Sequence, residues 1–210
     1  ALVDCGLVIE GEAGKRYDRF RDRIMFPILD QRGNVIGFGG RVIGQGEPKY
    51  LNSPETPLFE KGRELYGLLQ ARSAIRDEDC VIVVEGYMDV VALAQHGIGN
   101  AVATLGTATT PTHVHKLLRQ ADRVIFCFDG DNAGRKAAAR ALDASLEHVA
   151  DNKTIAFLFL PPEDDPDSYV RAHGADAFRK LGRQAMPLTD FLMQELRAGK
   201  DLATAEGRSQ

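Results

Sequence analysis

The chain has 210 residues, of which 44% are hydrophobic and 27% charged, and its formal net charge is −4 at pH 7. This composition is typical of a globular chain and excludes the collagen-like and disordered classes. No apolar stretch approaches the roughly 20 residues of a membrane-spanning helix, and the N-terminus lacks the residue series of a signal peptide. We therefore expect a cytoplasmic protein without a membrane partner. The three cysteines lack the CxxC spacing of a zinc site.

The charges are distributed unevenly along the chain. Residues 15–76 contain 12 Lys and Arg against 7 Asp and Glu, whereas residues 77–210 contain 14 against 20. A basic segment before an acidic one suits an enzyme that holds a polyanion with one part and metal ions with the other. A mixed, solvated surface is the alternative explanation for the basic excess.

The first part of the chain favours strands and loops. Two apolar runs, at 23–30 and 35–44, are separated by the turn sequence QRGN and predict a β-hairpin. Residues 46–68 contain three prolines without a clear period, which indicates a long ordered loop. We expect this loop to end in a short helix from about residue 61 to residue 76.

From residue 80 onward, strand patterns alternate with helix patterns. The expected strands are 81–85, 100–105, 123–129 and 153–160, and the expected helices are 87–97, 110–120 and 132–150. Strands joined by helices of this length predict an α/β fold, in which a parallel sheet with right-handed crossovers carries helices on both faces. An acidic turn, a short helix and two further helices follow, the last two at 177–182 and 187–199.

Acidic residues occur where three of these strands end: Glu85, Asp129 with Asp131, and the DDPD turn at 164–167. Open parallel sheets bind ligands outside the carboxyl ends of their strands, so these side chains are expected to lie close together. Two carboxylates about 6 Å apart repel by roughly 3 kcal/mol at an effective dielectric constant of about 20, which favours a cation between them. An all-oxygen ligand set selects Mg²⁺, for which Mn²⁺ can substitute.

The helix after Asp131 opens with two cations, Arg135 and Lys136. Cations in a first helical turn oppose the helix dipole, so their presence predicts an acidic neighbour or a phosphate. A salt bridge between Asp131 and Arg135, four residues apart, is the simpler alternative. A lone D-x-D motif is weak evidence by itself, because it also occurs as a helix cap and in phosphatases that use its first aspartate as a covalent nucleophile.

Several motifs, taken in order, resemble one family. VVEGYMDVVAL, VATLGTATT, VIFCFDGDNAGRKAA and DDPDSY resemble the TOPRIM domain, and the preceding YDRFRDRIMFPI, FGGRVIG and PKYLNSPETPLFEKGRELYGL resemble bacterial DnaG-type DNA primases. The resemblance covers residues 17–195. It implies a TOPRIM domain with a Rossmann-like sheet at 79–173, preceded by a partial basic α+β subdomain at 1–78 and followed by the start of a helical subdomain at 174–210.

The resemblance also implies a nucleotidyl transferase that copies single-stranded DNA into short RNA primers from ribonucleoside triphosphates. The chemistry would be two-metal phosphoryl transfer. The implied metal ligands are Glu85, also a candidate general acid/base, the pair Asp129 and Asp131, and Asp165 and Asp167 from the third acidic turn.

The same resemblance assigns a role to the basic segment. Arg41, Lys49 and Lys61 match a basic ridge for the template and the incoming nucleotide, and Asn52 lies in the same loop. Phosphate contacts give affinity without reading sequence, so binding of single-stranded DNA is expected to weaken with salt.

Three other titratable residues have simpler explanations. Asp89 lies four residues after Glu85 and supports the acidic cluster, or it is an ordinary acid at the start of a helix. His113 and His115 are two residues apart on a helix and point away from each other, which argues against a shared metal ion.

Primases of this family carry a zinc-binding domain before the core and a helicase-interacting domain after it, and the sequence contains neither. We therefore expect a monomeric fragment, with its zinc and its replicative helicase partner belonging to absent domains. The helix PLTDFLMQEL is expected to leave an apolar face partly uncovered.

The alternative function is a non-catalytic TOPRIM module that binds nucleic acid in a repair assembly, although such a module need not keep five mutually repelling carboxylates. A topoisomerase would need a nucleophilic tyrosine in a separate domain.

Overall fold

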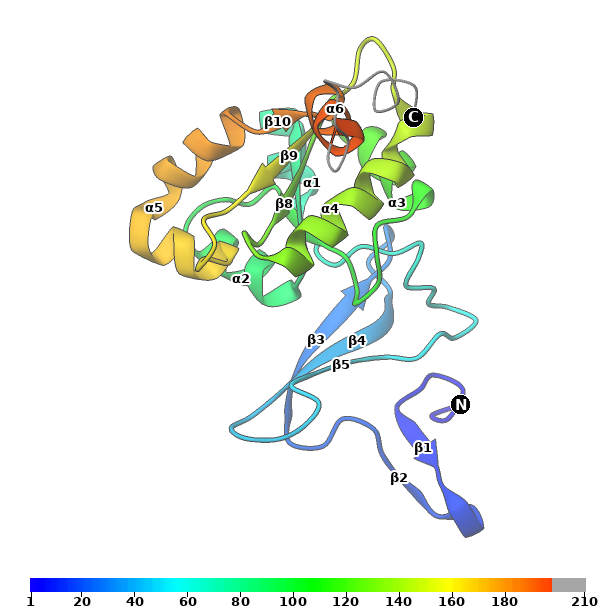
Figure 1. Cartoon of the computed structure of the whole chain (residues 1–210). Helices are drawn as coiled ribbons and strands as arrows, with labels where there is room; N and C mark the ends of the chain where they lie inside the picture. The colour runs from blue at the N-terminus through cyan, green and yellow to red at the C-terminus, as the bar shows by residue number, and fades with distance from the viewer. Residues whose placement is uncertain (198–210) are drawn as a thin grey trace.

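The computed structural model describes residues 1–197, which form three sheets and the helices around them (Figure 1). The N-terminal elements are β1 (Val8–Glu10), the 3₁₀ helix η1 (Glu12–Gly14), β2 (Arg16–Asp18), β3 (Arg23–Leu29), β4 (Val35–Val42) and β5 (Tyr50–Asn52). The remaining elements are α1 (Leu68–Glu78), β6 (Cys80–Val84), α2 (Tyr87–Gln95), β7 (Ala101–Ala103), α3 (Pro111–Leu118), β8 (Arg123–Phe128), α4 (Asn132–Ser145), η2 (Leu146–His148), β9 (Thr154–Phe159), α5 (Pro166–Arg183), β10 (Met186–Pro187) and α6 (Leu188–Arg197).

The larger sheet has the strand order β10-β9-β8-β6-β7. Strands β9, β8, β6 and β7 are parallel, which confirms the predicted α/β architecture, and β10 joins β9 antiparallel. Alternate residues of each strand face opposite sides. Val81 and Val83 of β6 contact the core shared with α1, α3, α4 and α6, whereas Ile82 and Val84 contact the core shared with α2 and α5.

The predicted hairpin is β3 and β4, and it forms the smaller sheet together with β5, a strand inside the segment expected to be a loop at 46–68; the three strands pair antiparallel. This sheet lies beside the parallel sheet in Figure 1, beyond the start of α2. A small core of Ile28, Phe59 and Leu105 connects them, with Tyr66 packed against it. The sequence did not predict the separate two-stranded ribbon of β1 and β2.

Two predicted elements differ from the structure. The helix expected from residue 61 begins at Leu68, because Tyr66 is extended and exchanges two backbone hydrogen bonds with Ala103, and Gly67 has a φ of +82°. The last predicted helix begins at Leu188, since Met186 and Pro187 form an edge strand. Its predicted end at residue 199 lies outside the described residues.

The expected domain boundaries after residues 78 and 173 stay predictions. The packing on either side of each boundary can be described. Helix α1 precedes residue 79, yet Leu68, Ala71 and Ile75 are buried in the core of the parallel sheet. The boundary after residue 173 falls at a kink in α5, where Gly174 has a φ of +80°. In α6, Phe191 is buried whereas Met193 is 47% exposed, so an apolar face is partly uncovered as expected. No helix among residues 1–197 has the length and apolar character needed to cross a membrane.

Candidate active site at the carboxyl edge of the parallel sheet

The expected acidic residues follow neighbouring strands at one edge of the sheet. Glu85 follows β6, Asp129 and Asp131 follow β8, and Asp165 and Asp167 lie beyond β9. Because these strands are parallel and adjacent, their carboxyl ends share the same edge. The smaller sheet approaches the same edge, since the ring of Tyr87, two residues after Glu85, packs against Phe26 of β3.

Backbone N–H groups fix one carboxylate oxygen of three aspartates near this edge, which are Asp89, Asp131 and Asp165. Asp131 caps α4, where its Oδ1 accepts from the Gly134 N–H at 2.7 Å. Asp165 caps α5 in the same way, accepting from the Ser168 N–H at 2.7 Å. The Asp89 Oδ2 accepts from the Gly86 N–H at 3.2 Å. Within residues 1–197 the second oxygen of each carboxylate accepts no hydrogen bond, so it is available to another partner.

The turn after β8 is tightly constrained by its glycines. A Cβ atom on Gly130 would collide with the backbone of Leu160 and Pro161, and one on Gly134 would collide with the carbonyl oxygen of Asp129. The glycines therefore let the chain between Asp129 and α4 pass directly beside the end of β9, which brings the acidic turns after β8 and β9 together.

The acidic side chains influence one another electrostatically. Burial raises the pKa of Glu85, although part of its side chain reaches solvent, and Asp129 and Asp131 raise it further. Burial, then Asp165 and Asp131, raise the pKa of Asp129. Burial and the charges of Asp165 and Asp129 raise the pKa of Asp89 to about 7. Asp89 is thus a member of the acidic cluster.

The oxygen donors of these carboxylates fit a hard divalent cation that takes its remaining ligands from water or phosphate. The carboxylates supply only oxygen, and their mutual repulsion would be relieved by a cation. Among residues 1–197, no group of three or more His, Cys, Asp and Glu is close enough to hold a metal ion alone. Mg²⁺ needs one or two carboxylates and completes its coordination with water or phosphate oxygens, so the residues present suit it.

The charged side chains of Asp131 and Arg135 do not pair with each other, whereas Asp167 has a basic partner. Asp131 and Arg135 form no salt bridge in the described part of the chain; the Arg135 guanidinium lies 5.2 Å from the centroid of the Phe159 ring. Asp167 instead pairs with Arg171, one helical turn away, at 2.5 Å. Asp167 still adds to the charge that raises the pKa of Asp89.

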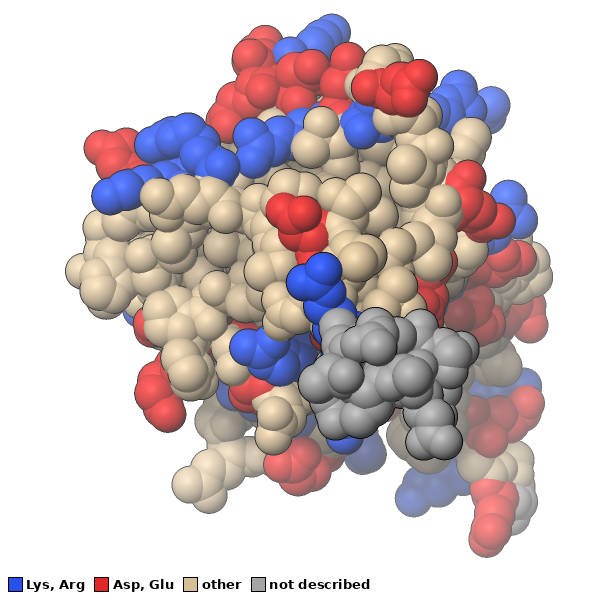
Figure 2. Space-filling model, turned by 45° about the horizontal axis from the view of Figure 1, so that its top comes forward, with Lys and Arg blue, Asp and Glu red and all other residues tan. Residues whose placement is uncertain are grey.

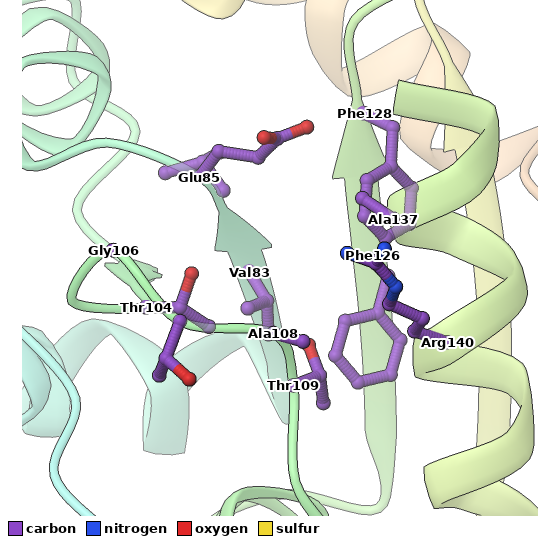
Figure 3. Close-up of a pocket in the computed structure, with 12 residues that line it drawn as sticks. Val83, Glu85, Thr104, Gly106, Ala108, Thr109, Phe126, Phe128, Ala137 and Arg140 are labelled. Carbon is purple, nitrogen blue, oxygen red and sulfur yellow. The ribbon is translucent and has the colours of Figure 1, made fainter. Parts of the chain in front are cut away.

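A cleft of about 270 Å³ lies beside Glu85. Its lining includes Thr104, the loop at 106–109 after β7, and Ala137 and Arg140 of α4. Figure 3 shows the Glu85 side chain extending from the end of β6 toward the end of β8, with Arg140 on the α4 side. We assigned no role to these lining residues from the sequence, although the 106–109 loop follows a strand at the same edge and could have been found by the argument used for Glu85.

The four predicted nucleic-acid residues lie on or beside the smaller sheet. Arg41 is on β4, and its charge offsets a small part of the burial that raises the pKa of the nearby Tyr87 hydroxyl to about 12. The Asn52 Nδ2 donates to the Leu105 carbonyl at 3.0 Å, which joins β5 to the loop after β7. Lys49 precedes β5, and its ammonium lies 5.5 Å from the centroid of the Tyr50 ring.

Lys61 is held through its backbone, where its N–H donates to Glu55 Oε1 at 3.1 Å. Asn52 and Lys61 are thus connected to the loop and helix that follow β7, while no contact joins Lys49 to the acidic cluster within residues 1–197. The face of the molecule in Figure 2 carries interspersed acidic and basic side chains rather than a field of one sign.

Two family models match the chain. The N-terminal domain of the DNA primase catalytic core matches residues 1–72, and the Toprim domain matches residues 79–156. A curated DNA primase from Pseudomonas aeruginosa is 59% identical over 211 residues, covering 100% of this chain and 32% of that protein. The chain spans about a third of the length of the curated relatives it matches.

Solved structures agree with these matches. A DNA primase domain from Pseudomonas aeruginosa has a TM-score of 0.94 and 59% identity, covering 99% of this chain and 65% of that one. A DnaG primase catalytic domain bound to single-stranded DNA has a TM-score of 0.94 and 53% identity, covering 99% of this chain and 67% of that one. The chain therefore belongs to the DnaG family of DNA primases and contains the N-terminal domain of their catalytic core followed by a Toprim domain.

Proposed function

We propose that this chain carries the nucleotidyl-transfer site of a bacterial primase, which makes short RNA primers on single-stranded DNA during replication in the cytoplasm. The observation that carries the proposal is the acidic cluster at the carboxyl edge of the parallel sheet, whose members raise one another's pKa. Like charges gathered at one edge of a sheet are costly unless a ligand uses them. The primase relatives, one of them solved with single-stranded DNA, support the choice of reaction.

We propose Mg²⁺, or Mn²⁺ in its place, as the ligand of this cluster. One or two carboxylates at a time from Glu85, Asp129 and Asp131 would hold it, with Asp165 and Asp167 on the neighbouring turn and Asp89 behind them. When bound, such a cation supplies charge stabilisation for a triphosphate and acidifies an attacking hydroxyl. The backbone hydrogen bonds to Asp131 and Asp165 support this assignment, because they orient the carboxylates before any ligand arrives.

Glu85 is the residue best suited to accept the proton of the primer 3′-hydroxyl. Its pKa is raised by burial and by its acidic neighbours, which makes its carboxylate a stronger proton acceptor than an ordinary glutamate. Arg41, Lys49, Lys61 and Asn52 would hold the phosphates of the template and the incoming ribonucleotide, since the smaller sheet, which carries Arg41 and Asn52, meets the acidic edge.

Incorporation of labelled ribonucleotides on a single-stranded DNA template tests the proposal. Asp129→Asn should reduce template-dependent product by more than about 100-fold, because it removes a charged ligand of the metal. Asp143→Asn is the matched control, since Asp143 is an exposed aspartate of α4 outside the cluster and should leave the rate unchanged. Equal product from the parent and Asp129→Asn would contradict the assignment. Single-stranded DNA binding without any product would favour a non-catalytic binding module.

A further inference from the structure

His113 is buried in the first turn of α3 and has no exposed surface. Its Nε2 lies 3.0 Å from the Lys61 carbonyl oxygen and 3.1 Å from that of Glu64. Both partners are acceptors, so Nε2 must carry a hydrogen. Its Nδ1 accepts from the Thr110 N–H at 3.3 Å. The surroundings thus select the neutral imidazole with its hydrogen on Nε2 and leave neither nitrogen free for a metal.

The same segment, residues 61–64, is held by two further contacts from α3 and its cap. The Thr110 hydroxyl donates to the Gly62 carbonyl at 2.6 Å. The Lys116 ammonium pairs with the Glu64 carboxylate at 2.9 Å, and both side chains are largely buried. Thr110 also ends the loop at 106–109 that lines the cleft beside Glu85. One helical turn therefore joins the Lys61 segment to the wall of the candidate active site.

Lys61 itself combines a fixed backbone with a free charge. Its N–H is held by Glu55 and its carbonyl by His113. In the described part of the chain its ammonium takes part in no salt bridge or hydrogen bond. The fixed backbone and the unpaired ammonium leave Lys61 available to an anionic ligand, and only its side chain remains to be ordered on binding.

We propose that His113 is a positioning residue that fixes Lys61 at the edge of the active site, where Lys61 contacts a phosphate of single-stranded DNA. The inference rests on the proposed function for the role of Lys61, and it adds a role for His113 that the metal site does not require. His113 contributes through the two carbonyl groups it binds rather than through proton transfer or coordination.

Two substitutions separate the contacts of His113. In His113→Gln the side-chain amide nitrogen reaches about as far as Nε2 and can donate to the same two carbonyls. In His113→Asn the amide ends near the position of Nδ1, so that it can satisfy Thr110 but not the Lys61 segment. His115→Asn, at an exposed position on the same helix, controls for changes in α3.

The test is the salt dependence of binding to a labelled single-stranded DNA oligonucleotide. Lys61→Ala should reduce the slope of log Kd against log salt by about 0.7, the value for one phosphate contact on a single strand. His113→Asn should reproduce this loss, and combining it with Lys61→Ala should add nothing. His113→Gln and His115→Asn should keep the parent slope. A general loss of stability would weaken binding without removing one ionic contact.

Each contrary result has its own meaning. A parent slope in His113→Asn, while Lys61→Ala loses its contact, would overturn the positioning role of His113. A parent slope in Lys61→Ala would instead contradict the phosphate contact assigned under the proposed function. Amide hydrogen exchange of residues 61–64 tests separately whether His113 holds this backbone segment. Exchange should accelerate in His113→Asn but not in His113→Gln. Equal exchange in both variants would overturn the proposal.

Discussion

At the scale of single residues, Asp89 shows how the acidic cluster affects stability. Its pKa is raised to about 7, mainly by burial and then by Asp165 and Asp129. A carboxyl group with a raised pKa contributes stability that is complete below its unfolded value of 3.8 and is lost as the pH rises through about 7. Without divalent cations, the protein should therefore lose part of its stability as the pH rises from about 4 to about 7.

The substitution Asp89→Asn tests this dependence. The amide oxygen of asparagine can still accept from the Gly86 N–H, while the repelling charge is removed. At pH 8 without divalent cations, the variant should exceed the parent by about 1 to 3 kcal/mol in free energy of unfolding, and the difference should shrink at pH 5. Urea denaturation at both pH values measures it. A difference that does not change with pH would contradict the raised pKa.

The sequence predicted the acidic residues correctly as a set at strand ends, because chain order and parallel pairing place them at one edge. It could not predict the individual partners. Arg135 was expected near an acid or a phosphate, and it stacks on Phe159 from β9. The sequence argues only against a metal role for His113, since its carbonyl partners lie about 50 residues earlier in the chain.

At the scale of elements, the turn between β8 and α4 depends on atoms that the sequence does not reveal. Gly130 has no room for a side chain, because the nearest atoms are backbone atoms of Leu160 and Pro161. In contrast, a Cβ on Gly182 of α5 would make an ordinary contact with the Ile125 side chain at 3.7 Å. Gly130 lies in the acidic DGD motif and Gly182 in a helical pattern, and the sequence alone does not show which of them could be replaced by a larger residue.

These two glycines should respond differently to alanine. Gly130→Ala should destabilise the protein by about 3 kcal/mol or more, because a strand end must move to relieve the collision. Gly182→Ala should change stability by less than about 1 kcal/mol, since helix propensity favours alanine and the contact is unstrained. Thermal and urea unfolding would distinguish them. Equal stabilities would mean that the turn after β8 can relax without cost.

The elements that the sequence missed were decided by long-range pairing. Residues 61–67 contain a helix-like pattern, but Tyr66 forms an isolated antiparallel bridge with Ala103 of β7. Pro187 begins the last predicted helix, yet it adds with Met186 to the open edge of β9. In both cases tertiary hydrogen bonds outweighed local propensity, which is a weak determinant over a few residues.

At the scale of the whole molecule, the contact between the two sheets sets how the smaller sheet lies against the acidic edge. Tyr87, directly after the Glu85 turn, packs against Phe26, Tyr50 and Tyr66. A Cβ on Gly39 of β4 would lie 2.7 Å from its ring. This glycine, part of the FGG motif, therefore allows the sheets to approach closely. The sequence predicted both sheets, but nothing in it specified this contact.

Substitutions at this contact should separate packing from hydrogen bonding. Gly39→Ala should lower the free energy of unfolding by about 1 to 3 kcal/mol, because the Tyr87 ring or β4 must shift. Tyr87→Phe should leave stability unchanged or slightly higher, since the buried hydroxyl has no hydrogen-bond partner among residues 1–197. Urea denaturation measures both variants. A large loss in Tyr87→Phe would contradict this description of the contact.

The central claim is that the carboxyl edge of the parallel sheet binds a divalent cation used in nucleotidyl transfer, and Mn²⁺ titration followed by electron paramagnetic resonance tests it most directly. The parent should bind Mn²⁺ and lose affinity by about tenfold or more in Asp129→Asn, while Asp143→Asn keeps the parent affinity. Added Mg²⁺ should displace the bound Mn²⁺ from the parent. Equal Mn²⁺ affinity in the parent and Asp129→Asn would contradict the claim.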